Sequence, residues 1–133
     1  MIPRYRVWDK QTERMHIVSG IDFNDGLVSS VNIWHEGWPW ILEPDEIVLM
    51  QYTGLKDKDG VEIFEGDIVA VENHPFQRKE DSSAGMKIEG DYVVGWNQHD
   101  LTWCAGDLLL ARLKPYVRVI GNIYENPELL EEQ

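Results

Sequence analysis

The sequence predicts a mostly β protein, a small and strongly bent β-barrel in the style of SH3 domains with an added β lobe at its amino terminus. Three observations lead to this expectation. Short alternating runs of apolar and polar residues are separated by turn formers along the chain. Gly54, Gly60 and Gly66 recur at a spacing of six, which suits the corners of tightly bent strands. A length of 133 residues with 43% hydrophobic content is sufficient for one folded core.

The first 48 residues predict two hairpins and an edge segment. The stretch "RYRVWDKQTERMHIV" has two short strands around a polar turn, and "IDFNDGLVSSVNIW" places turn formers at 24–26 between alternating runs. In the following "WHEGWPWILEPDEIV", Pro39 and Pro44 argue against one continuous strand or helix, so a short helical turn or an edge segment is expected. We expect residues 1–48 to form a β lobe that is not independently stable.

Residues 49–133 predict the barrel itself. The runs "DIVAV", "DYVVGW" and "YVRVIGNIY" are rich in β-branched residues, whereas "DLLLARL" fits either a strand or a helical turn. Between the first two runs, residues 73–90 are polar and predict a long hairpin excursion. The end, "ENPELLEEQ", predicts a short C-terminal helical turn with Asn126 as its cap and Pro127 at the first helical position.

The charge balance limits the partners of the chain. Twelve basic residues against 24 acidic ones give a net charge of -12, and residues 15–55 contain no lysine or arginine. A duplex phosphate backbone would be repelled, so we expect no direct nucleic-acid binding. The same charge would suit an acidic mimic of DNA that inhibits a host DNA-binding protein, which is the alternative function.

The chain predicts a cytoplasmic location without membrane contact. Cys104 is the one cysteine, so no disulfide and no multi-thiolate metal site can form within one chain. The start "MIPRYRVWDK" carries charges and a proline where a secretory signal would need an apolar run. No segment approaches the roughly 18 apolar residues of a membrane span.

The stretch "LMQYTGLKDKDGVEIFEGDIVAV", residues 49–71, raises the question of whether it forms a site or a scaffold. The stretch does not fit a calcium-binding loop, because the fifth and twelfth positions, which need oxygen ligands, fall on Val61 and Ile68. Its dense carboxylates could serve a metal-dependent nuclease or hydrolase, which is the third function considered, but carboxylates on turns are more often solvated. The carboxylates in question are Asp57, Asp59, Glu62, Glu65 and Asp67.

No other constellation predicts catalysis. Cys104 lies five residues after His99, but no orienting group is evident, and a small residue inside "LTWCAGDLLL" is more often packed. The four histidines show no paired spacing that would suit zinc without help from folding. Neither a nucleophile elbow nor a phosphate-binding glycine loop occurs. We therefore expect no catalytic residue, no cofactor and no metal site, and a protein that is not an enzyme.

Two long motifs resemble a known family. "LMQYTGLKDKDGVEIFEGDIV" and "VRVIGNIYENPELL" are similar to the YopX protein family of bacteriophages and prophages, and "YRVWDKQTERM" matches the opening pattern of that family. The similarity spans nearly the whole chain. It implies a phage-derived protein in a bacterial host with a largely β fold, and it supplies no activity or catalytic residue to transfer.

Three closely spaced tryptophans are the candidate functional residues. Trp34, Trp38 and Trp40 fall within seven residues in a segment without cations. They could pack the lobe against the barrel, or they could anchor a protein partner or a sister subunit, because tryptophan is favoured at interface centres. We predict a binding or assembly module of phage origin that forms a homo-oligomer and uses these tryptophans as its protein-binding residues.

Overall fold

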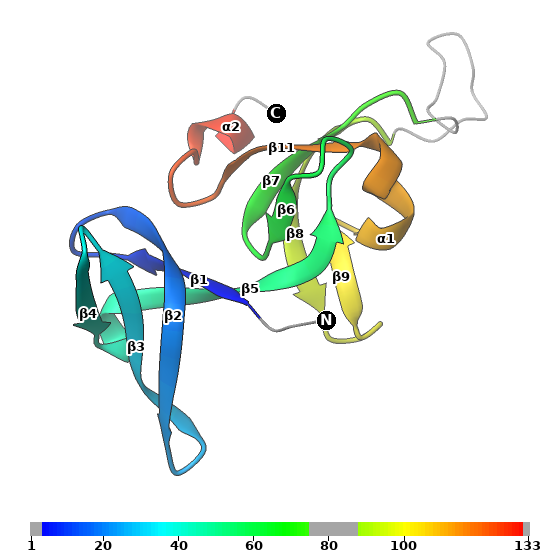
Figure 1. Cartoon of the computed structure of the whole chain (residues 1–133). Helices are drawn as coiled ribbons and strands as arrows, with labels where there is room; N and C mark the ends of the chain where they lie inside the picture. The colour runs from blue at the N-terminus through cyan, green and yellow to red at the C-terminus, as the bar shows by residue number, and fades with distance from the viewer. Residues whose placement is uncertain (1–3, 75–87, 132–133) are drawn as a thin grey trace, which may run out of the picture. The chain divides into compact units, whose positions relative to one another are not determined.

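The computed structural model describes residues 4–74 and 88–131 (Figure 1). In this described part the chain is mostly β and forms two antiparallel sheets. Its contacts divide it into an N-terminal unit, Met1–Tyr52, and a C-terminal unit, Thr53–Gln133. Strand β5 (Ile47–Lys56) passes from one unit into the other, so the predicted lobe boundary after residue 48 falls inside this strand. That residues 1–48 are not independently stable stays a prediction.

The N-terminal unit is a sheet with the strand order β4-β3-β2-β1-β5. Both of its two-residue hairpin turns, Asp25-Gly26 and Glu36-Gly37, have positive φ at each position, which suits the right-handed twist of paired strands. The proline-containing segment forms an edge strand followed by a 3-10 turn. The elements are β1 (Tyr5–Asp9), β2 (Arg14–Asn24), β3 (Leu27–His35), β4 (Trp38–Leu42), η1 (Pro44–Glu46) and the first part of β5.

One face of this sheet carries the core of the unit, and we call it the inner face. Its buried residues are Val7, Val31, Ile33 and Ile47, which come from the three strands β1, β3 and β5. Because successive side chains of a strand point to opposite faces, the residues between them lie on the outer face. The outer face bears exposed apolar side chains at Ile17, Trp34 and Ile41.

The C-terminal unit contains a five-stranded sheet with the order β10-β9-β8-β7-β11 in the described residues. Strand β6 (Glu62–Phe64) lies beside β5 in the other sheet. The remaining elements are β7 (Asp67–Val71), β8 (Gly90–Asn97), β9 (Thr102–Ala105), β10 (Leu108–Leu109), α1 (Leu110–Leu113), η2 (Lys114–Tyr116), β11 (Val117–Asn122) and α2 (Glu128–Glu131). No helix in the described residues is both long and apolar enough to cross a membrane.

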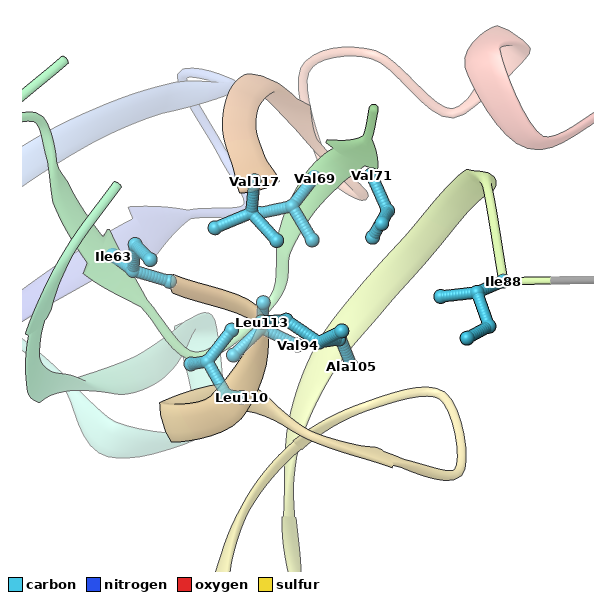
Figure 2. Packing of buried hydrophobic residues seen from close by; sticks show 9 residues of the cluster. All are labelled: Ile63, Val69, Val71, Ile88, Val94, Ala105, Leu110, Leu113 and Val117. Atoms are coloured by element: carbon cyan, nitrogen blue, oxygen red, sulfur yellow. The ribbon is translucent and has the colours of Figure 1, made fainter. Parts of the chain in front are cut away.

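The core of the C-terminal unit gathers side chains from β6, β7, β8, β9, α1 and β11 together with Ile88 (Figure 2). Leu110 and Leu113 of α1 pack into the same buried cluster as Val94 and Ala105. The stretch "DLLLARL" therefore forms both structures that its sequence allowed, a two-residue strand followed by one turn of helix.

The predicted barrel closure is not found among the described strands. The five-stranded sheet is open, with β10 at one end and β11 at the other. Strand β10 has only two residues, and α1 and η2 follow it directly, so this edge of the sheet continues as helical turns. Strands β7 and β8 pair with Val71 opposite Gly90. The excursion predicted between them, 73–90, falls mostly on residues 75–87, outside the described residues.

Candidate docking surface of the N-terminal unit

The motif at residues 49–71 contains a scaffold built around Asp57. Its Oδ1 accepts hydrogen bonds from the backbone N–H groups of Asp59 and Val61, each at 2.9 Å. Its Oδ2 accepts the backbone N–H of Val119 on β11, also at 2.9 Å. Asp57 is only 4% exposed, so this carboxylate ties a turn to a strand far away in the sequence.

A second buried carboxylate of this motif, that of Asp67, also accepts a hydrogen bond from the backbone. Asp67 is 2% exposed, and its Oδ2 accepts the N–H of Phe64 at 2.7 Å. In the part of the chain that the structure describes, no group of three or more His, Cys, Asp or Glu side chains is placed to hold a metal ion. The question raised by residues 49–71 is answered for Asp57 and Asp67, which hold the fold together.

The second long motif, "VRVIGNIYENPELL", likewise contains a turn held by side-chain hydrogen bonds. Asn122 Oδ1 accepts the backbone N–H groups of Tyr124 and Glu125 at 3.0 and 2.8 Å. Asn126, which the sequence predicted as a helix cap, directs its Oδ1 to the N–H of Asn122 at 3.2 Å, while its backbone oxygen accepts the N–H of Leu129. The side chain of Asn126 therefore fixes the turn that precedes α2.

The considered cysteine and histidine pair occupies two different environments. Cys104 is buried in β9 opposite Gly95, whereas His99 is exposed in the turn between β8 and β9. The backbone N–H of His99 donates to Asn97 Oδ1 at 2.9 Å. The described contacts join neither side chain to the other.

The three candidate tryptophans are exposed but lie on two different faces. Trp34 is 65% exposed, Trp38 71% and Trp40 49%, so none of them belongs to the core. Trp38 pairs with His35 and Trp40 with Ile33, which places both on the inner face of the sheet. Trp34 pairs with Pro39 and lies on the outer face. The sequence grouped the three residues, and the strand alternation separates them.

Beside Trp40 the inner face contains a hollow of about 200 Å³. The ring of His35 lies between those of His16 and Trp40, at centroid distances of 5.0 and 5.7 Å and near-perpendicular angles. These three rings come from β2, β3 and β4, so they cross the sheet at right angles to its strands. The hollow is lined by Asp9, Thr12, Arg14, His16, Ile33, His35, Trp40 and Leu42.

The electrostatics of this hollow are set by partial burial. Burial lowers the pKa of His16 from its ordinary value, and the nearby charges of His35 and Arg14 lower it further, whereas Asp9 opposes the shift. Asp9 itself is buried, and its two oxygens accept the N–H of Gln11 at 3.0 Å and the hydroxyl of Thr12 at 2.9 Å. The hollow therefore favours a neutral imidazole.

Sequence reasoning missed the contact between His16 and His35, although a signal for it exists. A two-residue turn at Asp25-Gly26 pairs Asn24 with Leu27, and continuing that register without interruption places residue 16 opposite residue 35. The β2–β3 ladder contains two register shifts, and the pair of Val18 with Ile33 shows that they cancel.

A larger hollow lies in the C-terminal unit. Its volume is about 460 Å³, and its lining includes the rings of His74 and Tyr116, whose centroids are 4.7 Å apart. Two of its lining residues, His74 and Ile88, flank residues 75–87, which the structure does not describe.

Comparisons with known proteins agree with the motifs. The family model described as YopX protein matches residues 4–131, which confirms the predicted resemblance. A similar solved structure is protein EF1440 from Enterococcus faecalis, at 28% identity and a TM-score of 0.66, with 98% of this chain and 99% of that chain covered. Protein yopX from Bacillus subtilis is similar in fold, at 19% identity and a TM-score of 0.51, with 95% and 96% covered. No curated protein matches the chain.

Proposed function

The chain belongs to the YopX protein family, and from the surface of its N-terminal unit we propose that it is a protein-binding and assembly module that forms a homo-oligomer. A phage origin, a cytoplasmic location in the bacterial host and the lack of an enzymatic role are parts of this proposal. The observation that carries it is the position of an exposed tryptophan, Trp38, on the same face as the hollow beside Trp40.

The hollow has a size that suits an aromatic side chain. An apolar cavity of roughly 150 Å³ holds a benzene molecule, and the hollow beside Trp40 measures about 200 Å³. Trp38 projects from the same strand with 71% of its surface exposed. A surface that carries both a projecting ring and a hollow for one is self-complementary under two-fold symmetry, where each copy inserts its ring into the other.

Side-chain contact is favoured over edge pairing for this association. Strand β4 is an edge strand, and its second residue, Pro39, has no N–H to donate. In a hairpin with a two-residue turn, His35 and Trp38 exchange backbone hydrogen bonds, so the backbone of residue 39 faces away from β3. Pro39 therefore blocks continuous pairing of a second strand with this edge.

Light scattering on the full chain across micromolar concentrations tests the proposal. We expect a mass of at least twice 15.5 kDa for the unmodified chain. The concentration below which the oligomer dissociates should be about tenfold higher or more for Trp38→Ala than for the unmodified chain, as expected for an interface anchor. The melting curve of this variant should show a folded monomer. Trp34→Ala is the matched control, because that tryptophan is similarly exposed on the opposite face. A mass of 15.5 kDa at all concentrations would refute self-assembly.

A further inference from the structure

The outer face of the N-terminal sheet is a second apolar surface. Ile17, Trp34 and Ile41 are 66%, 65% and 69% exposed and come from β2, β3 and β4. Pro39, which pairs with Trp34, is exposed beside them. These side chains are turned away from the inner face, so the hollow beside Trp40 is not part of this surface.

A fixed carboxylate stands on the same face. Asp22 Oδ2 accepts hydrogen bonds from Ser30 Oγ at 2.8 Å and from Asn32 Nδ2 at 3.1 Å. These two hydrogen bonds hold the pKa of Asp22 below its ordinary value, so the group is ionised at neutral pH. The second oxygen, Oδ1, accepts no hydrogen bond from the described residues. The exposed carboxylate is therefore oriented in advance and retains a free acceptor.

The carboxylate and the apolar side chains are neighbours. Asn32, which holds Asp22, pairs with Ile41 and lies two residues from Trp34 on the same strand and face. On its other side Asn32 pairs with Gly20, which has no side chain to cover it. Asn32 thus sits between the carboxylate and the apolar group, and a ligand can contact both.

The charges around this face select the occupant. Residues 15–55 contain no lysine or arginine, and the turns that end the β2–β3 and β3–β4 hairpins carry exposed acids at Asp25 and Glu36. A second copy meeting this face with its own outer face would bring the same carboxylates and no lysine or arginine from residues 15–55. A partner with basic side chains would meet opposite charge at each of these exposed acids.

We propose that the outer face of β2–β4 binds a protein surface in which arginine or lysine side chains adjoin apolar ones. A basic side chain of the partner donates to Asp22 Oδ1, and its apolar neighbours cover Trp34 and Ile41. Arginine fits best, because its planar guanidinium can pair with the carboxylate while stacking on an indole. This contact uses a different face and a different partner from the self-association, so it does not rest on it.

The advance orientation of Asp22 favours such recognition. An exposed ion pair normally gains little, because two mobile side chains must be ordered to make it. Here Ser30 and Asn32 already hold one of the two. Less side-chain entropy is lost on binding, and the loss of this carboxylate should weaken binding more than the loss of a mobile one.

The test uses fluorescently labelled peptides and the full chain at about 150 mM salt, where non-specific charge attraction is screened. The first peptide alternates arginine with leucine. In the second, glutamate replaces each arginine, and in the third, serine replaces each leucine. We expect anisotropy to show binding of the arginine and leucine peptide about tenfold tighter than either other peptide.

Two matched pairs of variants locate the contact. Asp22→Asn should weaken binding about fivefold or more, while Asp107→Asn, which changes the net charge equally but lies exposed in the C-terminal unit, should leave it within about twofold. Trp34→Ser should weaken binding, while Trp38→Ser on the opposite face should not. A melting curve of each variant shows that it is folded.

Three outcomes would overturn the proposal. The first is a lack of binding to the arginine and leucine peptide. The second is equal losses from Asp22→Asn and Asp107→Asn, which would mean attraction by net charge alone. The third is equal affinity for the glutamate and leucine peptide, which would mean an apolar contact without cation recognition. None of these results depends on whether the chain forms oligomers.

Discussion

The imidazole rings of His16 and His35 meet edge to face across neighbouring strands, with their centroids 5.0 Å apart and their planes at 80°. His35 also lies 3.6 Å from Glu36, from its Nε2 to a carboxylate oxygen. Two histidines in direct contact cannot both take up a proton without repelling each other. This arrangement couples the stability of the N-terminal sheet to pH.

We predict that the chain loses stability as the pH falls below 6.5. The pKa of His16 is lowered from 6.5 in the folded chain, mainly by burial, so the unfolded chain binds its proton first. Stability rises with pH wherever the unfolded state holds more protons, so this contribution is complete above 6.5 and is lost on acidification towards the lowered pKa. Asp9 weakens the effect, whereas Arg14 and His35 strengthen it.

Melting curves of the unmodified chain and His16→Gln between about pH 7.5 and 5.5 measure this effect. The unmodified chain should lose melting temperature more steeply than the variant, by on the order of one or two degrees. His99→Gln is the control, since His99 lies exposed in the β8–β9 turn. Parallel curves for the unmodified chain and His16→Gln would contradict the prediction.

Replacing Asp57 should destabilise the C-terminal unit strongly. Asp57→Ala leaves three backbone N–H groups without their acceptor, which should lower the free energy of unfolding by about 3 kcal/mol or more. Asp57→Asn keeps only one of the two acceptor oxygens, so its loss of stability should lie between that of Asp57→Ala and that of the unmodified chain. Asp59→Ala, in the same turn but exposed, should change stability by no more than about 0.5 kcal/mol. Urea denaturation compares the three variants, and a loss for Asp57→Ala no larger than for Asp59→Ala would show that Asp57 is not structural.

Gly66 should tolerate no β-branched residue. Its φ is +84°, where a side chain costs about 1–2 kcal/mol. Its N–H donates to the carbonyl of Val94 at 2.9 Å and its carbonyl accepts the N–H of Ile123 at 3.0 Å, so the backbone cannot shift freely. We expect Gly66→Val to lower the melting temperature, Gly66→Asn to lower it less, and Gly95→Ala, whose added Cβ meets no atom within 4 Å, to leave it nearly unchanged. An unchanged melt for Gly66→Val would refute the requirement for glycine.

Random duplex DNA should not bind at physiological salt. The net charge of -12 opposes the phosphate backbone, and the N-terminal segment from residue 15 to 55 contains no cation to offset it. A gel-shift titration measures this directly. Micromolar binding at about 150 mM salt would contradict the expectation and direct attention to basic side chains outside that segment.

The sequence by itself determined the local features of this protein. The turn at Asp25-Gly26 and the corners at Gly60 and Gly66 were readable because positive φ is a preference of single residues. The mostly β class followed from alternating runs, and the family followed from two long motifs. These properties depend on residues that are close together in the chain.

The tertiary structure decided everything that depends on register and on distant partners. Asp57 was readable as a turn residue, but its bond to the N–H of Val119 depends on how β11 is placed. Barrel closure was not found among the described strands, where the two-residue strand β10 leads directly into the helical turn α1, a choice that "DLLLARL" left undecided. A shift of one residue in pairing moves every side chain to the other face, so the separation of Trp34 from Trp38 and the meeting of His16 with His35 were fixed only when the strands had paired.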